Sequence, residues 1–260
     1  MRKNYIDNIK WMTQIIVVVY HVLLMYNAEG LIGGVGKITK LDIQYYDIFL
    51  YIPFPWAMAL LFLVSGMATK YYLDKHSNGA LLKSRTIKLL VPSTVGIAIF
   101  WFMQGYFNMK IIGNWEDVKV APLPLLYLIM ALNGIGVLWF IQVLWLDSVL
   151  LILIRKIEKG RLLELGKKTN TICILLFTVL IWGAMQVLNG KTFVVYRLGL
   201  YTASFLLGYF VFSHDEVMNR VKKLMPLYVV CAIVLGIIFC TKYWGANCSD
   251  PAINCSLVFA

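Results

Sequence analysis

Seven apolar stretches, each long enough to cross a lipid bilayer as a helix, follow one another along this chain. The hydrocarbon core of a bilayer is about 30 Å thick, so a spanning helix needs about 20 predominantly apolar residues. Hydrophobic residues make up 60% of the 260 positions and charged residues only 14%, whereas a soluble domain carries about 45–50% apolar residues. The sequence therefore predicts an all-α, polytopic integral membrane bundle. The seven stretches are 9–27, 48–72, 89–109, 137–154, 171–189, 196–212 and 226–244.

Three segments add detail to this pattern. Pro53 and Pro55 stand near the start of the second stretch, where they predict a kinked or interfacial first turn. Residues 121–135 are apolar but too short to span, so we expect them to lie along the interface or to re-enter the membrane. The last five residues begin an apolar segment that stops. We therefore expect one membrane domain over residues 1–260, incomplete at its C-terminus.

Basic residues concentrate in alternate loops. With a cytoplasmic N-terminus, 17 of the 24 lysines and arginines fall on the cytoplasmic side, and every inner loop is richer in them than its outer neighbours. The pattern predicts an N-in, C-out arrangement. The net charge of +11 lies in short clusters between apolar stretches and forms no basic domain, which excludes nucleic-acid binding.

The cysteines indicate neither a metal site nor a redox centre. Cys173, Cys231 and Cys240 lie in apolar stretches, where we expect small core residues. Cys248 and Cys255 lie in the outer tail, and whether they pair stays open. No spacing is typical of zinc, haem or iron–sulfur ligands, so we expect no metal and no tightly bound cofactor.

Lys10 and His21 are polar residues within or at the edge of the first apolar stretch. Eleven residues at about 100° each make three turns plus about 20°, so both side chains lie on one face of a helix, with Gln14 near the same stripe. Their axial separation is about 16 Å, half the thickness of the hydrocarbon core. An imidazole at that depth can act as a general base on a hydroxyl. The alternatives are a histidine that only bonds a neighbouring helix and a lysine that reaches the lipid headgroups.

A second cationic group precedes the third stretch. Arg85 and Lys88 stand three residues apart on one helix surface. With Lys83 they form a site suited to phosphates, which arginine can bind in a bidentate manner. The alternative is attraction to anionic lipid at the cytoplasmic surface.

Other residues within the stretches favour structural roles. Ser65 and Gly66 are expected to allow a close contact between helices. Trp139 and Phe140 begin the fourth stretch, where we expect aromatic anchors at the outer interface. Asp147 lies inside that stretch and needs a partner or a water-filled cavity, which the sequence does not identify.

Four segments, in order, resemble the membrane-bound acyltransferase 3 family. IDNIKWMTQIIVVVYH looks like the family's first helix, with a basic residue, ten intervening residues and a histidine, here Lys10 and His21. PWAMALLFLVSGM resembles the second helix with its serine–glycine pair. LLKSRTIKLLVPSTVGI is similar to the basic entry to the third helix, and VLWFIQVLWL to the tryptophan-led fourth. The resemblance covers about residues 5–155.

The resemblance implies a function and assigns roles. The family transfers acyl groups, often acetyl or succinyl, from cytoplasmic acyl-CoA to hydroxyls of glycans or similar envelope acceptors, as in the glucan- and polysaccharide-modifying O-acyltransferases. His21 would be the catalytic base and Lys10 its functional partner, with Arg85, Lys88 and Lys83 near the acyl donor. The family usually has arginine at the places of Lys10 and Lys88, and about ten spans. The partners would be the bilayer, acyl-CoA and the acceptor, in a bacterial cytoplasmic membrane that the chain crosses several times.

Two other functions stay open on the sequence alone. A transporter or flippase of a lipid-linked or acylated molecule would show broken helices in matching halves. Pro53 and Pro55 mark one such break, and no counterpart is visible in the second half. An inactive fragment is the other alternative. The acceptor, the acyl chain and the oligomeric state are not defined by the sequence.

Overall fold

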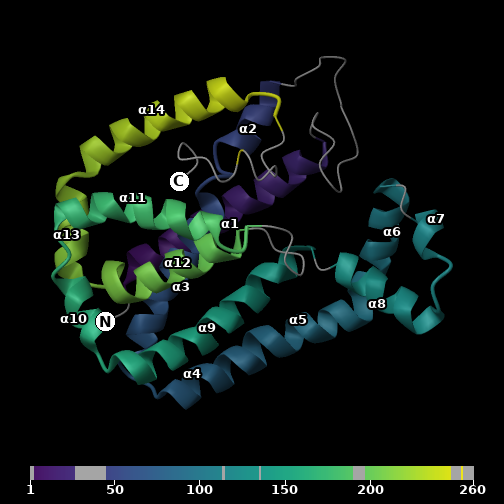
Figure 1. The fold of residues 1–260 in the computed structure, drawn as a ribbon, viewed down its shortest axis with the longest axis horizontal. Coiled ribbons are helices and arrows are strands. Elements are labelled where there is room, and N and C mark those ends of the chain that lie inside the picture. Colours follow the sequence, from purple (N-terminus) through teal and green to yellow (C-terminus); the bar gives the residue numbers. More distant parts are fainter. Residues whose placement is uncertain are drawn as a thin grey trace.

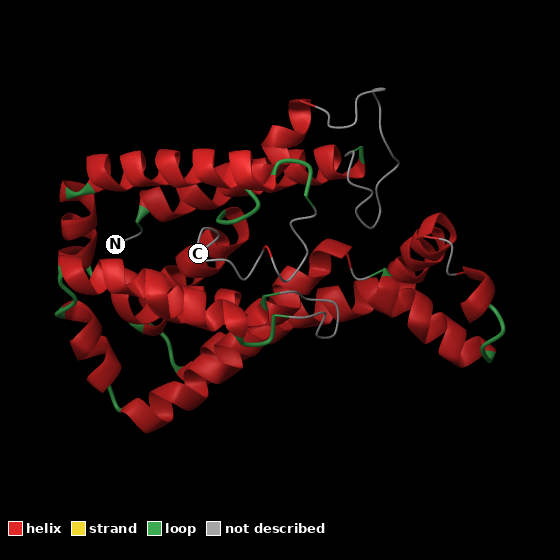
Figure 2. Cartoon of the chain, turned by 45° about the horizontal axis from the view of Figure 1, so that its top comes forward, coloured by secondary structure: helices red, strands yellow, loops and turns green. Residues whose placement is uncertain are grey.

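The protein is all-helical. The computed structural model describes residues 3–26, 45–112, 115–134, 136–189, 197–246 and 253, and this part of the chain consists of helices and turns without a strand (Figure 2). The predicted all-α class is confirmed, and each of the seven apolar stretches contains a helix. These helices are α1 (Asn4–Met25), α3 (Ala57–Leu73), the helix Asn78–Lys110, α9 (Trp139–Glu158), α11 (Thr171–Gln186), α12 (Leu198–Leu207) and α14 (Met225–Tyr243).

Length and composition identify two of these helices as able to cross a membrane, Asn78–Lys110 and Met225–Tyr243. The seven crossings and the cytoplasmic N-terminus therefore stay predictions. Shorter apolar helices are Ala57–Leu73, Leu123–Asn133, Thr171–Gln186 and Leu198–Phe212.

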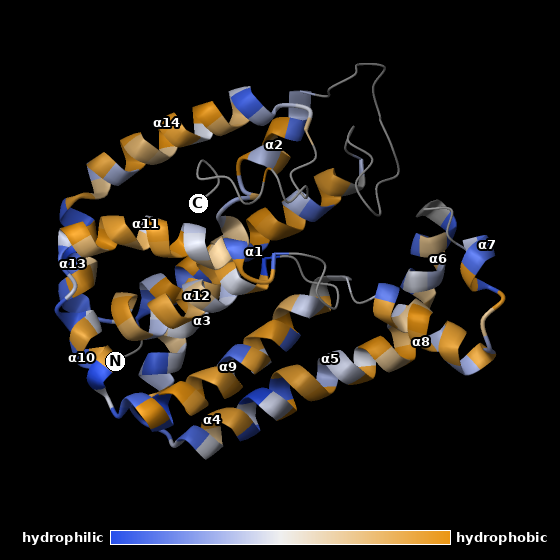
Figure 3. Ribbon diagram, viewed as in Figure 1, coloured by the Kyte–Doolittle hydropathy of each residue, from blue (hydrophilic) through white to orange (hydrophobic). Residues whose placement is uncertain are grey.

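Several helices consist mostly of hydrophobic residues (Figure 3), and many of their large apolar side chains are exposed. On α14 the buried residue is Phe239, whereas Val230, Ile233 and Ile237 are each more than half exposed. Cys231 is also exposed on this helix, so its expected place in the core is wrong. Apolar surface of this extent marks contact with a membrane or another protein, and the composition of the chain favours the bilayer.

The longest helix runs from Asn78 to Lys110 and measures about 50 Å at 1.5 Å per residue, more than the thickness of the hydrocarbon core. Pro92 lies inside it, where its ring would clash with the carbonyl of Lys88 in a regular α-helix. A wider π-helical turn immediately precedes this proline. The parts of the helix are α4 (Asn78–Arg85), η2 (Thr86–Leu90), α5 (Val91–Gly96), η3 (Ile97–Trp101) and α6 (Phe102–Ile112).

The predicted kink in the second stretch is confirmed. The short helices η1 (Tyr45–Asp47) and α2 (Ile48–Tyr51) precede a turn that contains Pro53 and Pro55. Proline lacks the backbone N–H that would continue the helix. The carbonyl of Pro53 instead accepts from the N–H of Ala57 at 2.9 Å, which starts α3 in a new direction.

An arm formed by α6 and α8 (Leu123–Asn133) projects from the bundle (Figure 1). A Cβ at Gly105 would stand 1.7 Å from the carbonyl oxygen of Met130, and one at Gly134 would stand 1.9 Å from that of Trp101. Gly105 lies opposite Met130, and the earlier residue Trp101 lies opposite the later residue Gly134. The two helices are therefore antiparallel, with their backbones in close contact. The segment 121–135, which was expected to lie along the interface or to re-enter the membrane, contains α8 and packs along the end of the long helix. Its position relative to a membrane stays a prediction. The short elements α7 (Trp115–Val118) and η4 (Gly136–Leu138) flank α8.

A close crossing in the core joins α3 to α12 and to its continuation η5 (Gly208–Phe212). A Cβ at Gly66 would stand 2.0 Å from the carbonyl oxygen of Phe205, and one at Gly208 would stand 1.9 Å from that of Leu63. The two glycines therefore let the backbones touch, as small residues do in membrane helices. This confirms the helix contact expected at Gly66.

Aromatic rings fill the space beside this crossing. The ring of Phe62, which is fully buried, lies 4.8 Å from that of Phe140 and 5.0 Å from that of Tyr201. Trp139 lies 5.2 Å from Tyr201. Trp139 and Phe140 are therefore partly buried against the core of the bundle, and their expected role as anchors at the lipid interface stays a prediction. Stacked and edge-to-face rings stabilise a core beyond the area they bury.

The loops that the charge pattern assigns to the cytoplasm meet at one end of the bundle, beside the N-terminus (Figure 1). Lys3 donates to both carboxylate oxygens of Asp215 at 2.7 and 2.8 Å. This hydrogen bond raises the pKa of the Lys3 ammonium above its usual range. The helices at this end are α10 (Arg161–Lys167) and α13 (Asp215–Lys223).

Three further contacts tie the same end together. Lys167 lies 3.5 Å from Glu216, Arg155 donates to the side chain of Asn78, and the hydroxyl of Tyr71 donates to the carbonyl of Ser213 at 2.8 Å. Loops far apart in sequence thus share one end, as the prediction of a common side requires. Which membrane face this end meets stays a prediction.

We expect Gly66→Ala to lower the free energy of unfolding by about 1–3 kcal/mol, the usual cost of overpacking a filled interior. The added methyl group would overlap the carbonyl of Phe205. Thermal unfolding of the purified protein in detergent measures the change. Gly183→Ala in α11 is the matched control, because a Cβ there meets nothing within 4 Å. Equal melting temperatures for the two variants would contradict the close crossing.

Candidate active site

Helix α1 has one side turned to the surroundings and one turned inward. Lys10, Thr13 and His21 follow one another at helical spacing on the inward side, where Thr13 is 3% exposed. Gln14 lies on the exposed side of this stripe. The inward side packs toward α3 and α2. The apolar residues of the outward side are Trp11, Met12, Ile15, Val18, Val19 and Val22.

The imidazole of His21 is held by its own helix. Its Nδ1 lies 2.7 Å from the carbonyl oxygen of Val17. A carbonyl only accepts, so the contact is a hydrogen bond only when Nδ1 carries the hydrogen. In the neutral ring this leaves a lone pair on Nε2. The geometry therefore presents Nε2 as the proton acceptor of this side chain.

Lys10 and Arg85 belong to one cluster of charges. They are 75 positions apart in sequence, yet the two cations lie close enough to interact electrostatically. Asp7, one turn before Lys10 on α1, also contributes to the field at the Lys10 ammonium. The structure thus brings together two of the residues that the sequence analysis singled out, one from α1 and one from the end of α4.

Arg85 is oriented by α3. Its Nη2 donates to Oγ1 of Thr69 at 2.6 Å. Thr69 is 1% exposed and donates its own hydroxyl hydrogen to the carbonyl of Ser65 at 2.7 Å. The hydroxyl oxygen is therefore left as an acceptor for the guanidinium. The serine–glycine segment of α3 thus supplies both a close helix contact and, one turn later, a partner for Arg85.

Asp147 supplies the negative charge of the cluster. It lies on α9, is 2% exposed, and its Oδ1 accepts from the hydroxyl of Thr202 on α12 at 2.8 Å. It also interacts electrostatically with Arg85. The hydrogen-bond partner that Asp147 requires is therefore Thr202, and Arg85 is its neighbouring opposite charge. Two residues before Asp147 on α9, the indole of Trp145 donates to Oγ1 of Thr86 at 3.0 Å and joins α9 to the long helix.

Lys83 and Lys88 lie apart from this cluster. Both side chains are exposed, whereas Arg85 between them is directed inward. Lys88 belongs to the π-helical turn η2, which changes the angular spacing that a regular helix would give to residues three apart. The structure therefore does not bring the three cations of this segment to one point.

Arg197, directly before α12, is a buried cation that the sequence did not single out. It is 4% exposed, and its guanidinium lies 4.5 Å from the centre of the Phe54 ring. Its Nη2 reaches the hydroxyl of Tyr201 at 3.2 Å. Phe54 in turn stacks on Tyr20, the neighbour of His21, at 6.3 Å. Phe54, the aromatic residue between Pro53 and Pro55, was the available signal for this cation–π contact.

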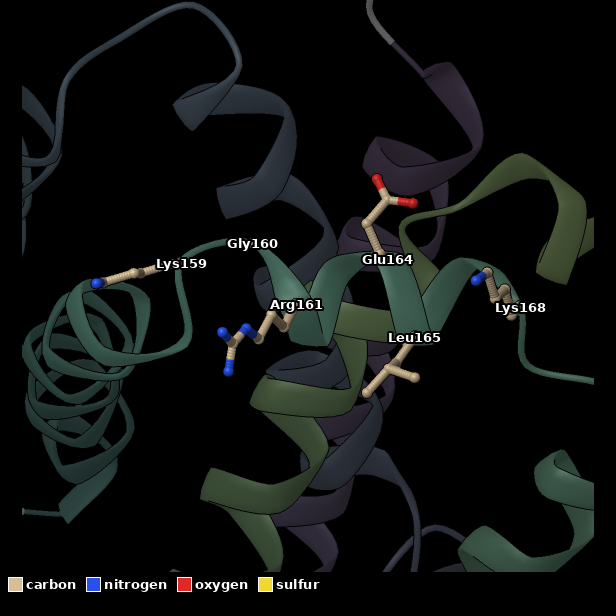
Figure 4. Close-up of a pocket in the computed structure, with 6 residues that line it drawn as sticks. All are labelled: Lys159, Gly160, Arg161, Glu164, Leu165 and Lys168. Carbon is tan, nitrogen blue, oxygen red and sulfur yellow. The ribbon is translucent and has the colours of Figure 1, made fainter.

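A shallow surface hollow of about 640 Å³ lies at the α9–α10 corner, away from this cluster. Its lining includes Lys159, Arg161 and Lys168, but the side chains point in different directions and Glu164 points away from them (Figure 4). Convergent polar groups are what distinguish a ligand site from a surface depression. The hollow therefore lacks the geometry of a substrate site.

The inward side of α1 carries groups for acid–base chemistry and for anion binding. Lys10 belongs to a cluster with Arg85 and Asp147, and the imidazole of His21 lies about three turns further along the same helix. In the described part of the chain no group of three His, Cys, Asp or Glu side chains could hold a metal ion.

Comparison with known proteins gives one match. The model of the acyltransferase 3 family, described as an acyltransferase domain, matches residues 3–258. No curated protein and no solved structure matches the chain. The match extends well beyond the first four helices, on which the sequence resemblance rested.

We expect Thr69→Val to lower the free energy of unfolding by about 1–3 kcal/mol, the cost of leaving a buried charged donor without its acceptor. Thr13→Val is the matched control, because Thr13 is equally buried and donates to the carbonyl four residues earlier, that of Ile9, at 2.7 Å. Thermal unfolding compares the two variants. If Thr69→Val were no less stable than Thr13→Val, the bond to Arg85 would contribute nothing.

Proposed function

The chain belongs to the acyltransferase 3 family, and on that premise we propose that it is a membrane enzyme that moves an acyl group from acyl-CoA to a hydroxyl of a glycan or another envelope acceptor. Members of the family are typically embedded in membranes, in keeping with the exposed apolar helices. The observation that carries the proposal is the imidazole of His21, whose Nδ1 is committed to Val17 and whose Nε2 is the acceptor.

In the proposed reaction His21 acts as the general base. Nε2 takes the proton of the acceptor hydroxyl while the hydroxyl oxygen forms its bond to the thioester carbonyl carbon. The resulting tetrahedral intermediate breaks its carbon–sulfur bond. The imidazolium then returns the proton to the sulfur of the departing CoA, so the histidine is regenerated and no cofactor is consumed.

The donor would bind on the cationic side of the bundle. Lys10 and Arg85 supply charge inside it, and Lys83 and Lys88 supply charge at its surface. Eleven residues of helix separate Lys10 from His21 by about 16 Å. The phosphates of CoA and its thioester sulfur lie at opposite ends of a long pantetheine arm. Phosphates near the cations are therefore compatible with a thioester near the imidazole.

The proposed setting is a bacterial cytoplasmic membrane with the N-terminus inside. The basic N-terminal segment and three basic loops share one end of the bundle, which supports a common side for them. Acyl-CoA is then taken from the cytoplasm, while the acceptor approaches from the opposite face.

We expect His21→Ala to reduce acyl transfer by about 10²–10⁴-fold, the usual contribution of a general base, without loss of membrane insertion. Membranes are incubated with acyl-CoA labelled in the acyl group, and the label is followed into the envelope fractions. Unchanged transfer by a correctly inserted His21→Ala variant would refute the mechanism.

His76→Ala is the matched control for this experiment. His76 is exposed at the α3–α4 turn, and its Nδ1 contacts the carbonyl four residues earlier, that of Tyr72, at 3.0 Å. It therefore repeats the local bond of His21 at a site away from α1. We expect this variant to keep wild-type transfer.

The orientation is tested by single cysteines in a variant whose five native cysteines are replaced by serine. Val120 is 79% exposed beside the α6–α8 arm, and Lys159 is exposed at the opposite, basic end. We expect a membrane-impermeant maleimide to label Val120→Cys in intact cells and Lys159→Cys only after permeabilisation. The reverse labelling would contradict a cytoplasmic N-terminus.

A further inference from the structure

Asp147 and Arg85 are opposite charges of one buried cluster, and each keeps one polar atom unused. Nη1 of Arg85 and Oδ2 of Asp147 are buried, and neither has a hydrogen-bond partner in the described part of the chain. Their other terminal atoms are engaged, with Thr69 and with Thr202. The two charges influence each other, although no direct ion pair joins them.

The arrangement links four helices. Arg85 extends from α4 to Thr69 on α3, and Asp147 extends from α9 to Thr202 on α12. Each charged side chain is thus held at one atom by a hydroxyl from a neighbouring helix. Both threonines are anchored on helices that meet in the tight glycine crossing, so neither can move far.

Asp147 supplies the negative charge that two neighbouring cations, Lys10 and Arg85, require. Lys10 and Arg85 lie within electrostatic range of each other and would repel. Charged side chains inside a membrane bundle are retained where they pair or serve a pathway. Removal of one partner of a buried pair leaves the other charge uncompensated. Asp147 is the carboxylate that compensates Arg85 from the side of α9.

We propose that Asp147 is a positioning residue, which keeps the guanidinium of Arg85 inside the bundle and aligned with Thr69 for recognition of the phosphate-bearing acyl donor. This role rests on the proposed function, because it assumes that Arg85 meets acyl-CoA. Without the carboxylate the guanidinium moves toward the lipid headgroups, where its long side chain can reach water. The proposed donor site then loses Arg85, the arginine that the cluster contributes to it.

The kinetic test compares Asp147→Asn with the wild type in detergent or in reconstituted vesicles. The asparagine keeps the shape of the side chain and an oxygen for Thr202 but removes the charge. We expect the KM for acyl-CoA to rise about tenfold, as for loss of one charge-assisted contact, with kcat changed by less than about threefold. Asp147→Glu keeps the charge and should recover part of the loss. An unchanged KM in folded Asp147→Asn overturns the proposal.

Two comparisons separate positioning from general damage. Ser148→Ala alters the next residue of α9, which is fully buried and donates only to the carbonyl of Leu144 in its own helix at 2.7 Å. We expect it to leave KM unchanged. Asp147→Asn introduced into Arg85→Gln should raise KM no further than Arg85→Gln alone. Additive effects would show that Asp147 acts independently of Arg85 and would overturn the proposal.

A second readout does not depend on activity. If the wild type shows no transfer from acyl-CoA, the proposed function fails, and thermal unfolding still tests the coupling. We expect Asp147→Asn and Arg85→Gln each to lower the melting temperature by about 5 °C, and the double variant to recover at least half of that loss, as for a buried pair replaced as a unit. A double variant less stable than both single variants would overturn the coupling.

Discussion

The close crossing of α3 and α12 sets the geometry on which the charged cluster depends. Gly66 and Gly208 let the two backbones touch at van der Waals distance, so neither helix can slide or rotate without a clash. Thr69 follows Gly66 by three residues, and Thr202 precedes Gly208 by six. The crossing therefore determines where the two hydroxyls stand, and these hydroxyls hold Arg85 and Asp147.

Hydroxyl side chains in this bundle show how polar groups are accommodated in apolar helices. Several buried ones donate to the carbonyl four residues earlier and involve no other helix. Thr69 makes the same local bond and still accepts from a guanidinium, because a hydroxyl has one hydrogen and two lone pairs. Thr202 donates instead to a carboxylate on another helix. In the cluster, hydroxyl groups thus bond charged side chains of other helices in addition to, or instead of, the carbonyl four residues earlier.

The features that could be predicted from the sequence are local ones. Apolar length and the prolines at 53 and 55 indicated the helices and the break before α3, because both act within a few residues. The stripe of α1 followed from helical periodicity alone. The ring contact between Trp139 and Tyr201 could not be predicted, because an amphipathic indole suits both an interface and a core.

The partners of buried charges could not be predicted, because they come from helices far apart in sequence. Thr202 is 55 residues from Asp147, and Phe54 is 143 residues from Arg197. Periodicity shows that a side chain faces inward but does not show which helix it meets. The spacing of Arg85 and Lys88 misled for a related reason, since it assumed a regular α-helix and the chain instead makes a π-helical turn before Pro92.

The lysines at positions 10 and 88 have different consequences for the proposed donor site. Lys88 is exposed, so a point charge there serves headgroups or phosphates without a defined orientation. Lys10 stands in the cluster, where a lysine cannot offer the planar, two-pronged contact of the arginine usual in the family. Bidentate recognition therefore falls to Arg85 alone. With one guanidinium instead of two, its orientation by Thr69 and its compensation by Asp147 matter more in this chain than they would in a relative that has both arginines.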